Sequence, residues 1–139
     1  MEALAGERNL EILLRTMRPD LQDGVFVFCT VARAEDIPET IRPVLLFRED
    51  EGMTLVIRRE EAEQARLSGQ FASRMITLAV HSSLEAVGLL AAVTTRLALA
   101  GISVNAVSAY FHDHLFVPVD RADDTLRILE DLSAEAPTG

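Results

Sequence analysis

The sequence predicts an α+β fold with antiparallel sheets and helices packed on one face of each sheet. From residue 74 onward the apolar pattern reads strand, helix, strand, hairpin strand and helix. This is the split βαβ order of the ferredoxin-like fold. Residues 25–68 repeat that order, with an irregular crossover in place of the first helix. We therefore expect two related units without a linker, residues 1–70 and residues 71–139.

The first half has the periodicity of two helices and three strands. Apolar residues recur every three or four positions over residues 7–17, which predicts an amphipathic helix. The apolar run at residues 25–31 predicts a strand buried on both faces. Two further apolar runs joined by a turn ending in Gly52 predict a hairpin. The other expected elements are a loop or short irregular helix at 32–42, hairpin strands at 44–47 and 53–57, and a helix at 59–68 that Gly69 ends.

The second half begins with a predicted strand at residues 75–80. Ser82 and Glu85 have the spacing of a capping box, so we expect a helix from about residue 83 to about residue 100. We expect this helix to end at Gly101. A hairpin should follow, with strands at 102–111 and 114–119 joined at His112–Asp113 and with Pro118 at the end of its strand. The last expected helix is capped by Asp120 and has Ala122, Leu126 and Leu129 on one apolar stripe.

The composition excludes several classes of partner and chemistry. Hydrophobic residues make up 49% of the 139 residues, enough to supply a continuous core. The 22 acidic residues exceed the 13 basic ones and give a formal charge of −9, which disfavours nucleic acid and anionic membranes as partners. All the basic residues are arginines, so Schiff-base chemistry and a lysine phosphate clamp are both excluded.

The lone cysteine, Cys29, lies in the apolar run of residues 25–31 and is interpreted as a buried structural thiol. The chain starts without a basic segment followed by an apolar one, and no apolar run approaches the roughly 20 residues that span a bilayer. We therefore expect a cytoplasmic protein.

Three segments carry a resemblance to a known family. They are residues 27–31, residues 47–56 and, most specifically, residues 76–116. Together they resemble small bacterial proteins with tandem ACT domains, which are related to the regulatory modules of amino-acid biosynthetic enzymes such as aspartate kinase. The resemblance implies a tandem ACT fold and a regulatory protein that is not an enzyme, has no catalytic residue and needs no cofactor.

The resemblance also implies a ligand site. In ACT domains generally, the loop from the first strand into the first helix carries an aspartate, a proline and a glycine, and amino acids bind there between two domains. Gly88 matches the glycine, whereas His81 or Ser82 and Val87 stand at the aspartate and proline positions. The implied ligand-binding residues are His81, Ser82, Ser83, Leu84, Glu85, Val87, Gly88, Leu89, Asn105, His112 and Asp113.

The residues alone leave the role of the segment Ser82–Glu85 open. A helix that starts at Ser82–Glu85 presents backbone N–H groups to a carboxylate, but a capping box also satisfies such donors internally. A glycine inside a helix costs about 1 kcal/mol relative to alanine. We therefore expect Gly88 to approach a ligand or a neighbouring backbone closely.

Three histidines suggest an alternative. His81, His112 and His114 follow or begin strands that end at one edge of the predicted sheet, and with Asp113 they could hold a divalent metal. A hydrogen-bonding or structural role is the more common use of such residues. A hydrolytic triad built on Ser82 or Ser83 is disfavoured because the nucleophile-elbow glycine pattern is absent.

The apolar residues of the predicted helix at 83–100 spread around the helix rather than keeping to one stripe. Such a helix is normally covered on more than one side. We therefore expect a homodimer that uses this helix or the sheet edges beside it. A dimerisation or protein-interaction module without a ligand is the second alternative.

Overall fold

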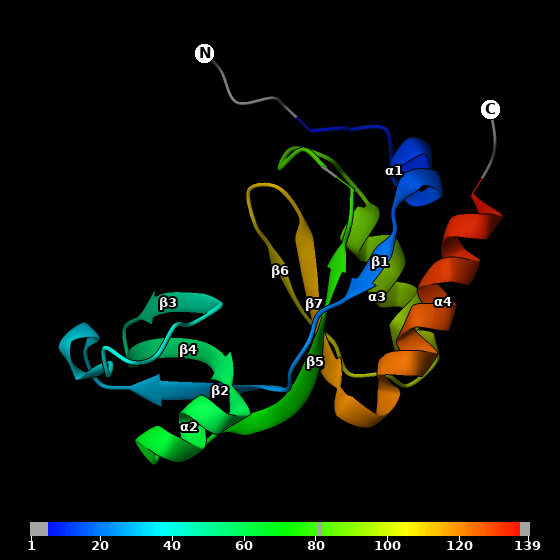
Figure 1. Cartoon of the computed structure of the whole chain (residues 1–139). Coiled ribbons are helices and arrows are strands. Elements are labelled where there is room, and N and C mark those ends of the chain that lie inside the picture. Colours follow the sequence, from blue (N-terminus) through cyan, green and yellow to red (C-terminus); the bar gives the residue numbers. More distant parts are fainter. Residues whose placement is uncertain (1–5, 81, 137–139) are drawn as a thin grey trace. The chain divides into compact units, whose positions relative to one another are not determined.

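The computed structural model describes residues 6–80 and 82–136 of the chain (Figure 1). The chain divides into two compact units. The central unit is Asp23–Arg74, and the terminal unit combines Met1–Gln22 with Met75–Gly139. No helix among the described residues is long and apolar enough to span a bilayer.

The central unit is a four-stranded antiparallel sheet with one helix. Its sheet order is β3-β4-β2-β5, and β5 contributes residues 70–74. The elements are β2 (Phe26–Val31), the short 3-10 helix η1 (Ala34–Asp36), β3 (Leu45–Glu49), β4 (Gly52–Arg58), α2 (Arg59–Ala65) and the start of β5 (Gln70–Leu78). The strands predicted at 25–31, 44–47 and 53–57 and the short irregular crossover are therefore confirmed, whereas β5 begins at Gln70 and ends at Leu78, earlier at both ends than the strand predicted at 75–80.

The core of the central unit lies between α2 and the strands β2 and β4. Val27, Leu55 and Ile57 are buried there against Ala62 of α2. Cys29 joins this core as predicted, and its burial raises the pKa of its thiol.

The predicted end of α2 at Gly69 is wrong. Arg66 takes the left-handed conformation at the end of the helix, with φ of 57°. Gly69 has a packing role instead, because a Cβ at that position would lie 2.7 Å from the Val27 side chain.

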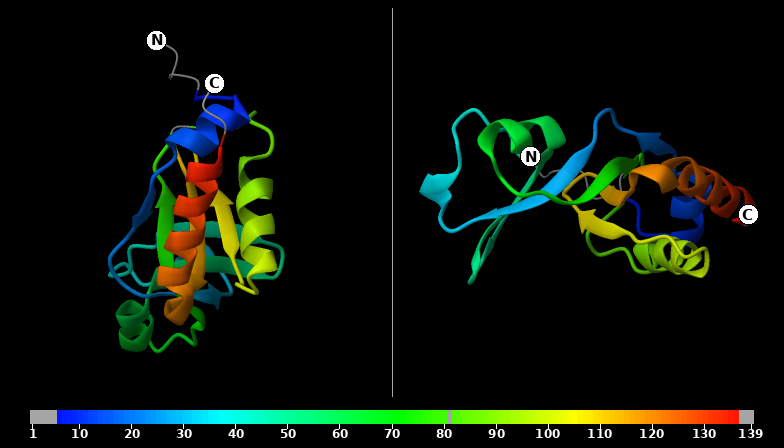
Figure 2. Two further views of the ribbon diagram at one scale, coloured as in Figure 1. Left: turned by 90° about the vertical axis from the view of Figure 1, so that its right-hand side faces the viewer. Right: turned by 90° about the horizontal axis from the view of Figure 1, so that it is seen from below.

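The terminal unit has a sheet of four strands in the order β1-β5-β7-β6, to which β5 contributes residues 75–78. Its helices α3 and α4 lie on one side of these strands (Figure 2). The elements are α1 (Leu10–Thr16), β1 (Pro19–Leu21), the end of β5, α3 (Leu89–Leu99), β6 (Asn105–Ser108), β7 (Asp113–Pro118), η2 (Val119–Arg121) and α4 (Ala122–Glu135).

The core of the terminal unit explains why residues from both halves of the chain belong to it. Leu13 and Met17, from α1 and its C-cap, are fully buried in the core that contains Ile76 and Leu78 of β5. Fully burying one such side chain contributes roughly 1.5–3 kcal/mol. β1 then pairs antiparallel with β5 and supplies the fourth strand of the sheet. The first 22 residues thus group with residues 75–139 in the terminal unit.

Three expected boundaries in the second half are wrong. The helix predicted from about residue 83 begins at Leu89, because the backbone of Gly88 has a φ of 103° that a helix cannot contain. The strand predicted at 102–111 is only Asn105–Ser108, and the turn is longer than His112–Asp113, since the N–H of Ala109 bonds to the carbonyl of His112.

The predicted cap at Asp120 is also wrong. Asp120 lies inside η2, and α4 starts after Arg121 without a side-chain cap. Pro118 is the last residue of β7, as predicted, so its missing N–H does not interrupt the middle of the ladder.

Candidate functional site

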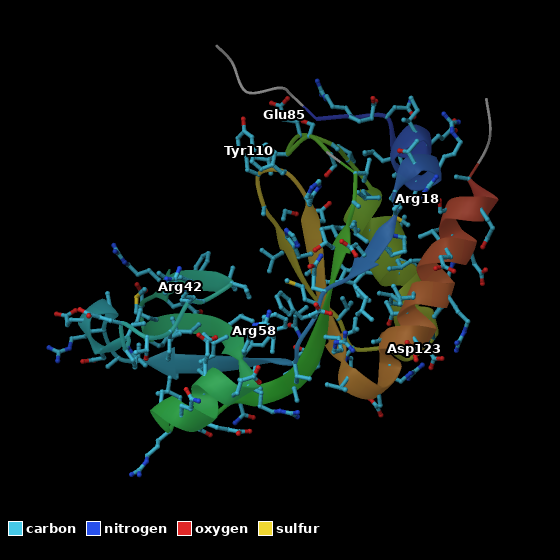
Figure 3. The ribbon with its side chains drawn as sticks, viewed as in Figure 1. Arg18, Arg42, Arg58, Glu85, Tyr110 and Asp123 are labelled. Atoms are coloured by element: carbon cyan, nitrogen blue, oxygen red, sulfur yellow. The ribbon has the colours of Figure 1, made fainter. Side chains whose placement is uncertain are left out.

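Two loops and the start of α3 enclose a small cavity in the terminal unit. The cavity has a volume of about 130 Å³. Its walls come from residues 82–91 and from the β6–β7 hairpin at residues 108–113. Glu85 and Tyr110 mark these two segments in Figure 3, where both lie at the same end of the terminal unit.

Asp113 is the buried acid of this cavity, with only 6% of its surface exposed. The Ser108 hydroxyl donates to Oδ1 at 2.7 Å, and the Ser82 hydroxyl donates to Oδ2 at 3.3 Å. Ser108 and Asp113 face each other in the ladder of the hairpin, which holds the Ser108 hydroxyl close to Oδ1 of Asp113. A carboxylate offers about four lone-pair positions. Each oxygen therefore has a lone pair left for a further donor.

The start of α3 forms another wall of the cavity. Gly88 is its N-cap and has no side chain to cap it, so no side-chain cap bond is formed. The Gly88 carbonyl accepts the N–H of Ala92 at 2.8 Å, which begins the helical bonding. Without a side-chain cap, the N–H groups in the first turn of a helix are available to solvent or a ligand, and the helix dipole makes this end favourable for negative charge.

The predicted capping box of Ser82 and Glu85 is not formed. The Glu85 N–H bonds to the Ser83 hydroxyl, and the Ala86 N–H bonds to the Ser83 carbonyl, so these residues form a turn before the helix. The Glu85 carboxylate lies 3.9 Å from the Arg8 guanidinium instead of reaching back to Ser82. The Ser82 hydroxyl is committed to Asp113.

The segment before α1 runs along this loop. The Ser83 N–H bonds to the carbonyl of Glu7 at 2.9 Å, and Glu7 and Ser82 form an isolated parallel bridge. A Cβ at Gly88 would lie 3.0 Å from Cδ2 of Leu10. Gly88 therefore approaches a side chain closely, where we expected a ligand or a backbone.

His112 and His114 are oriented by hydrogen bonds. His112 Nδ1 lies 3.3 Å from the Val80 carbonyl, and His114 Nδ1 lies 2.9 Å from the Thr77 hydroxyl. The two ring centroids are 6.4 Å apart. His81 lies outside the described residues. Within residues 6–80 and 82–136, no three His, Cys, Asp or Glu side chains gather closely enough to hold a metal ion.

Burial lowers the pKa of His114 below its usual value, and the charge of His112 lowers it further, while Asp113 opposes both effects. The Gln22 amide donates to the Thr77 hydroxyl at 3.2 Å. The hydroxyl can then donate its own proton to Nδ1 of His114. This arrangement favours the neutral imidazole.

The structure separates the expected site residues into two groups. Those that line the cavity are Ser82, Ser83, Leu84, Gly88, Leu89 and Asp113. Those that do not line it are Glu85, Val87, Asn105 and His112, and Val87 is 82% exposed. The lining residues that sequence reasoning missed are Ala86, Leu90, Ala91, Ser108 and Ala109. Ser108 was missed because the predicted two-residue turn at His112–Asp113 gives another hairpin register than the observed one, which places Ser108 opposite Asp113.

Two family models, each described as an ACT domain, match residues 5–74 and residues 70–131. The chain therefore belongs to the ACT-domain family, and the expected tandem ACT fold is confirmed. No curated protein matches the chain.

Solved structures agree with this assignment. A Vibrio cholerae protein of unknown function, described as a possible transport protein, is 46% identical with a TM-score of 0.81, over 89% of this chain and 95% of that one. An Agrobacterium tumefaciens protein is 17% identical with a TM-score of 0.69, over 84% of this chain and 89% of that one. The regulatory subunit of aspartate kinase from Thermus flavus is 10% identical with a TM-score of 0.61, over 83% and 96%. The last two likenesses concern the fold alone.

Proposed function

We propose that this chain is a regulatory protein of the ACT type that binds a free amino acid in the cavity at the start of α3 and catalyses no reaction. One observation carries the proposal. The same small cavity has a buried carboxylate, that of Asp113, on one wall and an uncapped helix start on another. A free amino acid carries the complementary pair of charges on adjacent atoms.

Each charge of the ligand has a matching group. The first-turn N–H groups of α3 suit the ligand carboxylate, because helix N-termini bind anions through free donors and the dipole. Asp113 suits the ligand ammonium, because it can accept further bonds and charge-assisted hydrogen bonds are the stronger kind. The volume of about 130 Å³ favours an amino acid with a small side chain.

A regulatory role is supported by the family and by the names of structural neighbours. The Thermus flavus neighbour is a regulatory subunit of aspartate kinase. A regulatory subunit must change another protein's activity in response to a ligand, which requires a binding site rather than a catalytic one. We propose the cavity beside α3 as that binding site in the terminal unit.

The first test is thermal stabilisation by each of the proteinogenic amino acids. A ligand that binds only the folded state stabilises it by about 2.7 kcal/mol at a hundred times its Kd. We expect stabilisation by at least one small amino acid and its loss with the corresponding amide and N-acetyl derivatives, which each remove one of the two charges. Stabilisation that is equal for the acid and the amide would contradict binding at the helix start.

The second test compares Asp113→Asn with Asp120→Asn by titration calorimetry. The asparagine side chain keeps the shape of the aspartate and loses the charge that faces the ammonium group. We expect at least about a tenfold loss of affinity, since bonds to charged groups contribute roughly 1.5–3 kcal/mol. Asp120 is exposed and lies outside the cavity, so its variant should bind like the parent. Equal affinity of the Asp113→Asn variant and the parent would refute the assignment.

A further inference from the structure

A second cavity of the terminal unit lies where α1 and α4 end. Its volume is about 400 Å³, within the roughly 300–1,000 Å³ that small-molecule sites occupy in proteins. Its lining comes from residues 15–19, at the end of α1 and the start of β1, and from residues 130–136, at the end of α4. The Ser133 hydroxyl donates to the carbonyl of Arg15 at 3.1 Å and so joins the two helix ends.

Part of this lining is apolar. Met17 and Ala136 are buried, whereas Pro19 is partly exposed and Ala134 is exposed. A small molecule in the cavity would remove this apolar surface from water, which is favourable when the molecule is itself apolar at that point. The lining therefore fits a ligand with an apolar body.

Hydrogen bonds hold Arg18 in this cavity at both ends of the residue. Its backbone carbonyl accepts the N–H of Ala79 at 2.8 Å. Its Nη1 donates to the carbonyl of Arg15 at 3.3 Å and to that of Met17 at 3.0 Å. The guanidinium is thereby positioned at the end of α1, where Figure 3 labels it. A group held in this way loses little further freedom when it binds a ligand.

One edge of the Arg18 guanidinium has no use in the folded chain. A guanidinium has five N–H donors. Within residues 6–80 and 82–136, the Nε and Nη2 of Arg18 make no hydrogen bond, since only Nη1 binds the carbonyls at the end of α1. Two adjacent guanidinium nitrogens are the group with which an arginine binds both oxygens of a carboxylate or a phosphate.

The other charges around the cavity favour an anion with a single charge. The carboxylate of Glu130 belongs to the same lining. The last carbonyls of α4 are the negative end of a helix dipole, and α4 ends at this cavity. A phosphate monoester would bring about two negative charges against these groups at neutral pH, whereas a carboxylate brings one. The chemistry therefore favours a carboxylate over a phosphate.

We propose that this cavity is a second ligand site, which binds an organic monocarboxylate with an apolar body. The two carboxylate oxygens accept from Nε and Nη2 of Arg18, and the apolar body covers Pro19 and Ala134. None of the residues that line this cavity lines the cavity beside α3, so the proposal does not depend on the amino-acid site.

The experiment is amide-resolved NMR of the isotope-labelled full-length protein, titrated separately with hexanoate, isovalerate and hydrocinnamate. We expect at least one of them to give saturable shifts that are largest at residues 15–19 and 130–136. The amide of the best carboxylate should bind at least about tenfold more weakly, because bonds to charged groups are the stronger kind. Phenyl phosphate should bind more weakly than hydrocinnamate.

Two variants locate the carboxylate in the cavity. Arg18→Gln removes the guanidinium and should weaken binding at least about tenfold. Ala134→Trp fills the exposed side of the cavity without changing its charge and should prevent binding. The control is Arg127→Gln, because Arg127 is an exposed arginine of α4 outside the cavity, and this variant should bind like the parent. Circular dichroism shows whether each variant is folded.

Several results would overturn the proposal. One is the absence of any saturable shift with all three carboxylates, and another is equal binding of a carboxylate and its amide. Tighter binding of phenyl phosphate than of hydrocinnamate, or parental affinity in both Arg18→Gln and Ala134→Trp, would also overturn it. So would shifts confined to residues 82–91 and 108–113, which would place the carboxylate in the cavity beside α3.

Discussion

At the scale of single residues, the place of Asp113 at the site could be predicted from the sequence, whereas its contact with Ser108 could not. Asp113 was expected at the site because it follows the predicted strand that ends beside Ser82. The contact of Ser108 with Asp113 depends on a hairpin register that the predicted strand 102–111 did not specify. A polar residue in a strand carries no signal of its partner until the turn is known, because the turn sets which residues face each other.

His114 gives a prediction on pH. Its pKa is lowered in the folded protein, mainly by burial, whereas in the unfolded chain it is about 6.5. The unfolded state therefore binds the proton more readily, so the stability contributed by neutral His114 is complete above about pH 6.5 and falls as the pH drops below it. We expect His114→Gln to lose less stability than the parent between about pH 7.5 and about pH 5.5.

Chemical denaturation at the two pH values measures this difference directly. The glutamine side chain of this variant can still bond to the Thr77 hydroxyl, which keeps the local contact while removing the titration. His112→Gln removes the charge that lowers the His114 pKa but leaves the burial, so it should keep most of the pH dependence. An identical pH dependence in the parent and the His114→Gln variant would show that His114 does not titrate differently in the two states.

At the scale of elements, the start of α3 differs most from its prediction. The serine and glutamate spacing predicted a helix from about residue 83, but a positive φ at Gly88 moves its start to Leu89. A capping-box pattern is local and cannot compete with contacts made by distant residues. Here the Ser82 hydroxyl bonds to Asp113 and the Ser83 N–H bonds to Glu7. The resulting loop is what forms one wall of the cavity.

Gly88→Ala tests this account of the helix start against Gly101→Ala. Both glycines have positive φ, 103° and 72°, so alanine is strained at each by about 1–2 kcal/mol. Only at Gly88 would the new Cβ also meet a side chain, Cδ2 of Leu10 at 3.0 Å, while nothing lies within 4 Å at Gly101. We expect Gly88→Ala to reduce the free energy of unfolding more than Gly101→Ala.

Urea denaturation of the two variants and the parent provides the comparison. Equal losses would mean that Leu10 moves aside at no cost and that its contact does not fix the loop. The same geometry makes Gly88→Leu an unsuitable test of ligand binding, because a bulky side chain would strain the backbone and collide with Leu10 whether or not a ligand binds there.

At the scale of the molecule, the fold class followed from the order of elements, but the grouping of the elements did not. The split βαβ pattern identified the strands β2 to β7 and the helices α2, α3 and α4. β1 was missed because three residues, Pro19–Leu21, are too short to show an alternating pattern. The apolar stripe predicted the helix at residues 7–17 correctly, but an apolar stripe does not show in which of the two cores the helix packs. Burial of Leu13 and Met17 beside Ile76 decides that.

The central claim is that a free amino acid binds between the start of α3 and Asp113. A titration of the isotope-labelled full-length protein with the most stabilising amino acid, followed by amide-resolved NMR, tests it most directly. The account predicts that the largest shifts fall on residues 82–91 and 108–113, with saturation at one ligand per chain. Shifts concentrated in the central unit, at residues 23–74, or the absence of any saturable shift would contradict it.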